Sequence, residues 1–500
     1  MPTSRCDVAV VGAGPAGAAA AVTAVRAGAR VVMLDGEARP GGQYWRHGPG
    51  GDAGSTGVHE HVADWRALSH RLQQALASGR LTHLARTRVW RLDPSPDAAT
   101  PARLQATTPD VDGTDRPVVV EAAAVVLAPG AHDRVLPFPG WDLPGVLTAG
   151  AAQALLKEHA VAAGSRAVVA GTGPFLLPVA VALAEAGVRV LEVDEAGDGR
   201  GWARSWRAAA ASPGKVADGA RYAALLARHR VPVHLRQAVV AAHGTDQLEA
   251  VTVARLDVDW RVVPGSERQV ACDTAAVGWG FVPRLELALQ AGCATAPAAD
   301  GTPAVVVDGS GRTTVPNVLA AGEITGVAGA DLALLEGALT GTAAAAVAGG
   351  RRPPPVHPGV ASRRTRLAAF AAALHQAHPV RDGWATWLDD GTTVCRCEEV
   401  SVGMLHDAVD ELGASDARTA KLFTRAGMGW CQGRMCGEAV ARLVAARGGT
   451  TFDGYRDLLA GAARPVAVPV SLGALAGVRP VLPTTAPELE PLPDTPGGTA

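Results

Sequence analysis

Two stretches of the chain repeat the same pattern of apolar strand, glycine-rich turn, apolar helix and second apolar strand. In the first stretch, residues 7–11 form a buried strand and a second strand at residues 30–34 ends in Asp35. In the second stretch, strands at residues 166–170 and 188–193 flank the helix. Because short apolar strands alternate with helices, the pattern predicts an α/β chain with parallel sheets.

The turn after the first strand has the full G-x-G-x-x-G spacing. Its residues are, in order, Gly12, Ala13, Gly14, Pro15, Ala16 and Gly17. The first glycine allows a tight turn, the second lets the backbone approach a pyrophosphate, and the third lets helix and strand pack closely. Asp35 is placed to accept a hydrogen bond from a ribose. Turn, helix, strand and acid together predict a dinucleotide-binding site.

The second unit has a similar turn with one change. Gly171 and Gly173 keep their positions, but Leu176 replaces the third glycine, so helix and strand cannot approach as closely. Asp194 would be the ribose-binding acid, and Glu195 beside it would repel a 2′-phosphate, which favours NAD over NADP. Three interpretations stay open: the unit binds NAD, it binds another adenine nucleotide, or it is only structural.

Four cysteines near the C-terminus form a C-x-C pair, a long gap and a C-x4-C pair. They are Cys395, Cys397, Cys431 and Cys436. Thiolates suit an iron–sulfur cluster or tetrahedral zinc equally well. The single residue between Cys395 and Cys397 favours a larger inorganic core, because zinc usually takes cysteines about two to four residues apart. The spacing therefore predicts a [2Fe–2S] cluster, with zinc, free thiols or a disulfide as alternatives.

Composition limits the classes of function. A chain of 500 residues with 48% hydrophobic residues can form about two to four domains with sizeable cores. Its formal net charge of −2 offers no electrostatic surface for nucleic acid. The remaining cysteines, Cys6, Cys272 and Cys293, are scattered, so a protein of the reducing cytoplasm is expected. The apolar stretch 8–25 contains the glycine turn, so neither a signal peptide nor a transmembrane segment is expected.

Residues 1 to about 350 resemble the two-dinucleotide-binding-domain flavoproteins of the pyridine nucleotide–disulfide oxidoreductase superfamily. Besides the two turns, residues 41–43, 125–131 and 314–323 resemble segments that pass the flavin or close its domain. The resemblance implies FAD at the first site. Further FAD contacts would come from Gly42, Gln43, Gly130, Gly322 and Glu323. It also implies two nested Rossmann-like domains, an FAD-binding domain of residues 1–155 and 286–350 and an inserted NAD-like domain of residues 156–285.

The cysteine region, residues 386–450, closely resembles the bacterioferritin-associated-ferredoxin-like (BFD-like) [2Fe–2S] domain. The similar residues include the four cysteines and glycines whose amides could reach the cluster. Nearby cations, Arg396, Lys421, Arg425 and Arg434, would offset its negative charge or stay solvated. Around this lobe we expect a linker and helix at residues 351–385, a C-terminal arm at 451–480 and a disordered tail at 481–500.

The order of these domains resembles the α subunits of dye-linked proline and hydroxyproline dehydrogenases and of opine oxidases, and the middle subunit of hydrogen cyanide synthase. The resemblance implies a partner, a glycine-oxidase-like flavoprotein subunit that oxidises the amine or amino acid, and an electron-transfer role for this chain. It allows an additional flavin, FMN, at the subunit interface. The alternatives are a self-sufficient NAD(P)H-dependent FAD and iron–sulfur reductase, or a zinc-stabilised binding protein.

Two absences from the sequence bear on this resemblance. The histidines are dispersed and no paired-carboxylate or Ser/His/Asp spacing indicates general-base catalysis, so no catalytic residue is predicted. No C-x2–4-C pair occurs within the first 350 residues, so disulfide reduction is not expected. Neither the substrate nor the terminal electron acceptor can be predicted from this chain.

Overall fold

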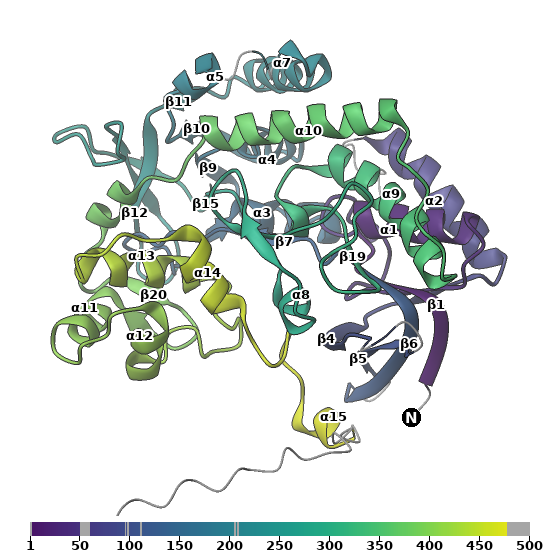
Figure 1. The fold of residues 1–500 in the computed structure, drawn as a ribbon. Helices are drawn as coiled ribbons and strands as arrows, with labels where there is room; N and C mark the ends of the chain where they lie inside the picture. Colours follow the sequence, from purple (N-terminus) through teal and green to yellow (C-terminus); the bar gives the residue numbers. More distant parts are fainter. Residues whose placement is uncertain are drawn as a thin grey trace, which may run out of the picture.

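The computed structural model describes residues 3–477, except for 51–60, 96, 98–99, 111–112, 205–206 and 208–209. Two α/β units and a small helical lobe make up the described chain (Figure 1). The fold class predicted from the sequence is confirmed. The expected tail at residues 481–500 lies outside the described residues.

A seven-stranded sheet forms the first unit. Its order is β3-β2-β1-β6-β5-β4, with β19 beside β6. The strands are β1 (Thr3–Val11), β2 (Val31–Leu34), β3 (Leu81–Leu84), β4 (Arg88–Asp93), β5 (Ala102–Pro109), β6 (Asp115–Leu127) and β19 (Val318–Ala320). Val8 of β1 pairs in parallel with Val31 on one side and Ala124 on the other. The middle of β1 has no exposed area, as expected for a parallel strand covered on both faces.

Helices α1 (Pro15–Arg26) and α9 (Ala330–Ala348) cross this sheet in close contact, and α2 (Val62–Ala77) packs beside α1. Glycine permits the contact, since a Cβ on Gly337 would lie 2.1 Å from the Ala16 carbonyl oxygen. In the described part of the chain, α9 is the one helix long and apolar enough to cross a bilayer. It is 56% buried within the protein, so its apolar character is explained by its place in the core.

A five-stranded parallel sheet forms the second unit, in the order β11-β10-β9-β15-β8. Its strands are β8 (Val146–Thr148), β9 (Arg166–Gly171), β10 (Arg189–Glu195), β11 (Val233–Leu235) and β15 (Thr274–Gly278). Its helices are α3 (Ala149–His159), α4 (Leu176–Glu185), α5 (Arg200–Arg204) and α7 (Pro213–Arg228). A three-stranded sheet of β12 (Gln237–His243), β13 (Ala250–Arg255) and β14 (Arg268–Ala271) packs beside it.

The sequence placed the boundary between the two units at residue 155, but in the structure the second unit begins earlier. Strand β8 pairs with β15, and α3 packs against α4, so residues 146–159 belong to the second unit. The chain passes between the units through β7 (Ala131–Asp133) and β16 (Phe281–Pro283), which pair with each other. Short elements then lead back to the first sheet: α8 (Glu286–Gln290), β17 (Thr295–Pro297), β18 (Pro303–Val305) and the 3-10 helix η1 (Glu323–Thr325).

The long helix α10 (Pro358–Ala377) runs across both units and leads into the cysteine lobe (Figure 1). The lobe contains η2 (Asp382–Trp387), β20 (Thr393–Cys395), β21 (Val400–Ser401), α11 (Val402–Asp410), α12 (Ala417–Thr424), α13 (Gly437–Arg447) and α14 (Gly454–Ala462). Its core is continuous with that of the second unit, because the tilted rings of Trp260, Trp279 and Trp387 pack in a row with centroids 5.4 and 6.0 Å apart. The lobe is therefore packed against the second unit rather than tethered by a linker.

The C-terminal arm returns to the first unit. The amide of Ala467 donates to the Trp90 carbonyl oxygen at 2.8 Å, and α15 (Leu472–Ala476) contacts β6. The described part of the arm therefore packs on the first unit.

Candidate cofactor sites

Close backbone contacts shape the first glycine turn. Gly12 has φ +95°, and a Cβ there would lie 2.2 Å from the Ala128 carbonyl oxygen. A Cβ on Gly17 would lie 1.9 Å from the Gly12 carbonyl oxygen, so α1 can pack here only if this residue is glycine. A Cβ on Gly42 would lie 2.7 Å from the Gly14 Cα. The predicted turn and the G-G-Q segment therefore lie against each other.

The acid of the first site has unsatisfied hydrogen-bonding capacity. Asp35 is 5% exposed, and its Oδ1 accepts the Glu37 amide at 3.3 Å. Its Oδ2 is buried without a hydrogen-bond partner, which a ribose hydroxyl would satisfy. A Cβ on Gly322 would lie 2.7 Å from the Ala16 Cβ, so the segment that ends in Gly322 closes against α1. These residues fit the adenosine and diphosphate of FAD.

The other residues expected to contact FAD have fewer close contacts that fix their positions. Pro15 is the first residue of α1, where its missing amide costs no helical hydrogen bond. Gly130 has φ +77° and open space around its Cα. Gln43 is exposed and its side-chain oxygen accepts a hydrogen bond from Arg46.

Glu323 lies where helix α9 begins. Its two carboxyl oxygens accept the amides of Ala328 at 2.7 Å and Gly329 at 3.1 Å. Burial raises the pKa of Glu323 to about 7, although these amides lower it, and the charge of Glu336 adds to the rise. The carboxyl that the resemblance assigns to the ribityl chain thus occupies the N-terminus of α9.

The second glycine turn differs from the first in its helix. Gly171 has φ +135° and a Cβ would lie 1.8 Å from the Gly278 carbonyl oxygen, so the strand ends meet closely here as well. Leu176 is 1% exposed, and α4 begins at this residue, whereas α1 begins directly after Gly14. The larger side chain therefore delays the helix and leaves fewer helical amides close to the turn.

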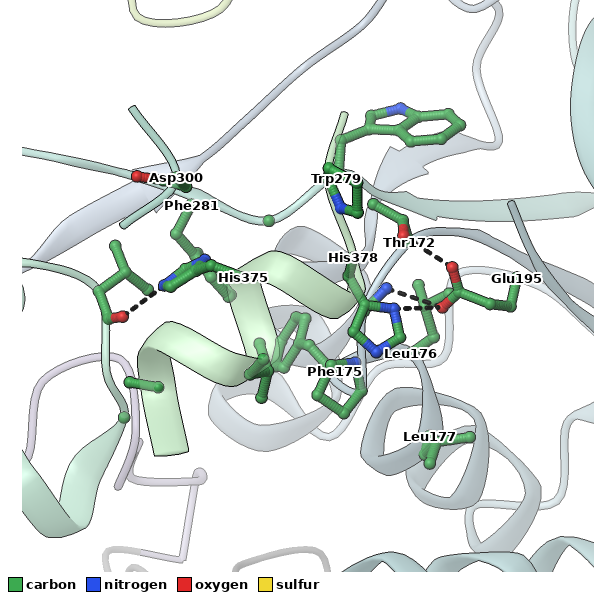
Figure 2. Close-up of a pocket in the computed structure, with 18 of the residues that line it drawn as sticks. Thr172, Phe175, Leu176, Leu177, Glu195, Trp279, Phe281, Asp300, His375 and His378 are labelled. Atoms are coloured by element: carbon green, nitrogen blue, oxygen red, sulfur yellow. Dashed lines mark hydrogen bonds and ion pairs between the residues drawn. The ribbon is translucent and has the colours of Figure 1, made fainter. Parts of the chain in front are cut away.

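Glu195, rather than Asp194, faces this second turn. Its carboxyl accepts the Gly173 amide at 2.8 Å and the Thr172 hydroxyl at 2.6 Å (Figure 2). Asp194 has no exposed area and neither of its oxygens has a hydrogen-bond partner. Neighbouring side chains of a strand point to opposite faces, so only one of these two acids of β10 can face the turn. Glu195, and not Asp194, therefore occupies the position beside the turn where the sequence placed the ribose-binding acid.

His378, which follows helix α10, lies next to the carboxyl group of Glu195. The indole N–H of Trp202 donates to His378 Nε2 at 3.1 Å, so the proton of a neutral imidazole sits on Nδ1. His378 Nδ1 lies 3.4 Å from Glu195 Oε2 (Figure 2). Burial acts to raise the pKa of Glu195, but hydrogen bonds from His378, Thr172 and the Gly197 amide lower it below its usual value.

A cavity of about 1050 Å³ extends from this turn. Gly173 and Glu195 line one part, while Glu323 and Gly329 line another, so it reaches the N-terminus of α9. Trp279 and Phe281, from the segment between the two units, also line it (Figure 2). The cavity is large enough for a nucleotide and leads toward the expected position of the flavin.

The four cysteines form two pairs, each with one member from either half of the array. Cys395 lies beside Cys436, and Cys397 beside Cys431, so that the two thiols of each pair influence each other's pKa. The neighbouring Cys436 thiol lowers the pKa of Cys395 to about 5, and the Gly427 amide donates to Cys395 Sγ at 3.5 Å. Two pairs of thiolates are what a [2Fe–2S] cluster requires, two for each iron.

The spacing between these pairs disfavours zinc. Within the described residues, three potential ligand atoms lie within 4.8 Å of one another only at Glu192, Asp194 and His234. The four sulfurs thus do not converge on one point, whereas four thiolates around a single zinc lie about 3.8 Å apart. A wider, two-metal core fits this arrangement.

The two cysteine pairs differ in exposure. Cys395 and Cys436 are each 1% exposed and lie in the core shared with the second unit. Cys397 is exposed and Cys431 is half-buried, and Trp430 beside Cys431 is 79% exposed. One side of the cluster site therefore faces the protein interior and the other faces solvent.

Ion pairs on both sides of Cys436 attach the cluster site to the rest of the chain. Arg434 donates to Glu286 of α8 at 2.6 Å, and Glu438 accepts from Arg134 at 2.8 Å. Arg134 also bonds Asp300 at 3.2 Å and lines the large cavity. The site is thereby fixed to residues that follow β7 and β16, the crossing between the units.

The cations expected around the cluster differ in their partners and in their burial. Arg425 pairs with Glu398, and Arg396 donates to the Asp142 carbonyl oxygen at 3.0 Å. Burial lowers the pKa of Lys421, and the charge of Arg464 lowers it further while that of Cys436 opposes this. Arg464, which the sequence did not indicate, therefore joins Lys421 near the cysteines.

Comparison with known proteins agrees with these sites. The family model of pyridine nucleotide-disulphide oxidoreductases matches residues 6–350. This chain belongs to that family. The model of the BFD-like [2Fe-2S] binding domain matches residues 393–446, which include all four cysteines. The cofactors are therefore FAD and a [2Fe–2S] cluster, and the zinc alternative is set aside.

Relatives within this family match most of the chain. The HcnB protein of hydrogen cyanide synthase from Pseudomonas aeruginosa is 33% identical over 442 residues, covering 85% of this chain and 90% of its own. The A subunit of opine oxidase from Agrobacterium tumefaciens is 33% identical over 462 residues, with 88% and 86% covered. The alpha subunit of sarcosine oxidase from a Corynebacterium is 34% identical, covering 69% of this chain but 33% of its own.

A solved structure supports the fold. L-proline dehydrogenase from P. horikoshii superposes with a TM-score of 0.62 at 20% identity, over 95% of this chain and 80% of that one. The family, the cluster domain and these relatives make the chain an FAD and iron–sulfur oxidoreductase related to subunits of opine oxidase, hydrogen cyanide synthase and sarcosine oxidase.

Sequence reasoning missed the residues that close the second site. Glu195 appeared only as a neighbour of Asp194, and His378 only as one of the dispersed histidines. The alternation of β10 could have assigned Glu195 to the turn if the strand end had been placed one residue later. His378 and Trp202 come from distant parts of the chain, and no spacing relates them.

Proposed function

We propose that this chain is the electron-transfer subunit of a heteromeric dehydrogenase or oxidase acting on CH–NH or CH–NH2 donors. The amine-oxidising site would lie in a partner, a glycine-oxidase-like flavoprotein subunit, with an amino acid such as proline, hydroxyproline or glycine, or an opine, as substrate. Support comes from the relatives, which are named as subunits of enzymes of this kind. The absence of a general-base constellation from the sequence agrees with this division.

The observation that carries the proposal is the two-sided cluster site. Its inner pair, Cys395 and Cys436, is buried in the core that the lobe shares with the second unit. Its outer pair, Cys397 and Cys431, lies beside Trp430 at the surface. When bound, FAD exchanges electrons singly or in pairs and the cluster exchanges them singly. A carrier with one face inside and one face outside suits transfer between this chain and another protein.

Residues of the chain hold this arrangement in place. Arg134 and Arg434 tie the segment around Cys436 to the crossing between the units and to α8. The Gly427 amide donates to Cys395 Sγ, and such a bond stabilises negative charge on a ligand sulfur. Packing of the lobe against the second unit buries the inner pair away from solvent.

The test compares the chain alone with the chain and its partner, both without oxygen. The purified chain, with flavin and iron present, should keep its visible spectrum when proline, glycine or an opine is added. It should bleach when the substrate is added together with the amine-oxidising partner. Bleaching of the isolated chain by an amino acid would contradict the proposal.

A surface variant sharpens this test. Trp430→Ala removes the most exposed aromatic side chain beside the outer cysteines, and should slow cluster reduction by the partner about tenfold or more. Leu472→Ala, on α15 and 83% exposed, is the control and should leave the rate unchanged. Equal rates for Trp430→Ala and the wild type would place partner contact elsewhere.

A second function, an NAD(P)H-dependent reductase, is favoured by one observation. The large cavity joins the second glycine turn to the N-terminus of α9, which is the route that a nicotinamide would need to reach a flavin. The late start of α4 at Leu176 weighs against it. Rapid bleaching of the isolated chain by NADH would establish this function. An interface FMN and a cytoplasmic location remain parts of the proposal for the complex.

A further inference from the structure

Strand β10 carries a second group of ionisable side chains, on the face that points away from the cavity. Glu192 and Asp194 alternate along β10, and His234 is the direct partner of Asp194 on β11. One ligand atom from each lies within 4.8 Å of the other two. This group belongs to neither the FAD site nor the cluster site.

Several buried carboxylate oxygens of this group have no hydrogen-bond partner. Both oxygens of Asp194 and Oε1 of Glu192 are buried without a hydrogen-bond partner, and Asp194 has no exposed area. Arg268 donates to Glu192 Oε2 at 2.6 Å and to Gln237 at 3.3 Å, so it neutralises one carboxylate only. Buried carboxylates are normally paired or bound to a cation, and Asp194 is neither.

We propose that Glu192, Asp194 and His234 bind a divalent first-row metal ion, of the class of Mn²⁺ or Zn²⁺, in the second unit. Two carboxylate oxygens and one imidazole nitrogen are ligands that these ions accept, and water would complete the coordination. His234 is half-buried, with its side chain 36% exposed, so an ion can enter from its side. Its Nε2 lies 3.5 Å from Glu192 Oε2, a separation that two ligand atoms of one ion can have.

The charge balance supports the proposal. The two buried carboxylates have one guanidinium partner, Arg268, which bonds Glu192 and leaves Asp194 without a partner. A divalent cation would supply the missing positive charge.

Such an ion would also fix one wall of the cavity. Val193 and Glu195 of β10 and Val233 and Leu235 of β11 line the cavity, and they alternate with the proposed ligands. A metal ion across the back of the two strands would hold their carboxyl ends together. The ion is thus expected to have a structural role next to the second glycine turn.

The test uses the full chain with FAD and an intact, oxidised cluster, and Mn²⁺ alone as the probe. Thiolate sites take up little Mn²⁺, so the cysteines do not interfere. Titration followed by the electron paramagnetic resonance of free Mn²⁺ should show one ion bound per chain. His234→Gln and Asp194→Asn should each weaken this binding at least tenfold.

His229→Gln, an exposed histidine at the end of α7 in the same unit, is the matched control and should bind as the wild type does. His234→Gln changes a half-exposed side chain, so its folding can be verified from unchanged flavin and iron content. Failure of the wild type to bind one Mn²⁺ with a dissociation constant below about 1 mM would overturn the proposal. Equal binding by the wild type and His234→Gln would also overturn it.

Discussion

Arg134 donates to Glu438 at 2.8 Å, across the contact between the flavin-binding units and the cysteine lobe. Arg134 directly follows β7 and Glu438 lies two residues after Cys436, and both side chains are less than 10% exposed. Arg442 also pairs with Glu438 at 2.9 Å, and Asp300 with Arg134 at 3.2 Å. This buried network joins the cluster ligands to the cavity wall.

Arg134→Ala should destabilise the chain by about 3–5 kcal/mol, because it leaves Glu438 and Asp300 with less compensation in a buried setting. Denaturant unfolding followed by flavin and iron absorbance would measure this loss. The cluster should be released at a lower denaturant concentration than in the wild type, since the lobe loses one of the two ion pairs described on either side of Cys436.

A surface pair provides the comparison. Arg5 pairs with Glu121 at 2.8 Å, but its side chain is 78% exposed. Arg5→Ala should cost less than about 1 kcal/mol. If Arg134→Ala costs no more than Arg5→Ala, the network does not attach the lobe.

Cys436→Ser should abolish the iron–sulfur absorption and leave the flavin spectrum, because the inner cysteine pair supplies half of the cluster ligands. Iron and acid-labile sulfide measured on the purified chain would check this. Cys272→Ser is the control, since Cys272 is also buried, at 4% exposed, but belongs to the core of the second unit. Retention of two iron atoms by Cys436→Ser would remove this residue from the ligand set.

Local patterns predicted most of the fold because each unit is built from contiguous segments. The two turns, their helices and the strands that follow are decided by residues within about 30 positions of one another. The unit boundary was placed at residue 155 because β8 is only three residues long, and its pairing with β15 joins segments far apart in the chain. Short strands carry too little periodicity for such pairing to be predicted.

The residues of the candidate sites also fall into those that local sequence patterns predict and those that only tertiary contacts bring together. The four cysteines and the first turn are visible as spacings, since cofactor chemistry requires them close together in the chain. The closure of the second turn by His378, and the pairing of Arg134 with Glu438, depend on tertiary contacts between distant segments. The sequence assigned Asp194 instead of Glu195 to the second turn because the assignment depends on where β10 ends. Sequence patterns locate a strand end only to within about two to four residues.

Glu195→Gln should weaken the binding of an adenine nucleotide at the second turn by about tenfold or more, because a charged acceptor for ribose hydroxyls becomes neutral. Calorimetric titration of the chain with NAD and with ADP would measure the change. Thr252→Val, which removes a half-buried hydroxyl on β13 away from the cavity, is a control for general effects on the second unit. Equal affinities for wild type and Glu195→Gln would show that Glu195 does not contact the ribose.

Glu323→Gln should flatten the dependence of stability on pH. The pKa of Glu323 is about 7 in the folded chain against a usual value of 4.5, so the folded state holds this proton more tightly than the unfolded state. This contribution to stability is complete below about pH 4.5, declines as the pH rises, and is lost above about pH 7, with an upper limit of about 3 kcal/mol. Unfolding free energies of the FAD-loaded chain between pH 5 and 8 should therefore fall more steeply in the wild type than in Glu323→Gln. Glu185→Gln, an exposed carboxyl at the end of α4, should follow the wild type. Parallel profiles for wild type and Glu323→Gln would mean that bound FAD or the amides of Ala328 and Gly329 keep this carboxyl ionised.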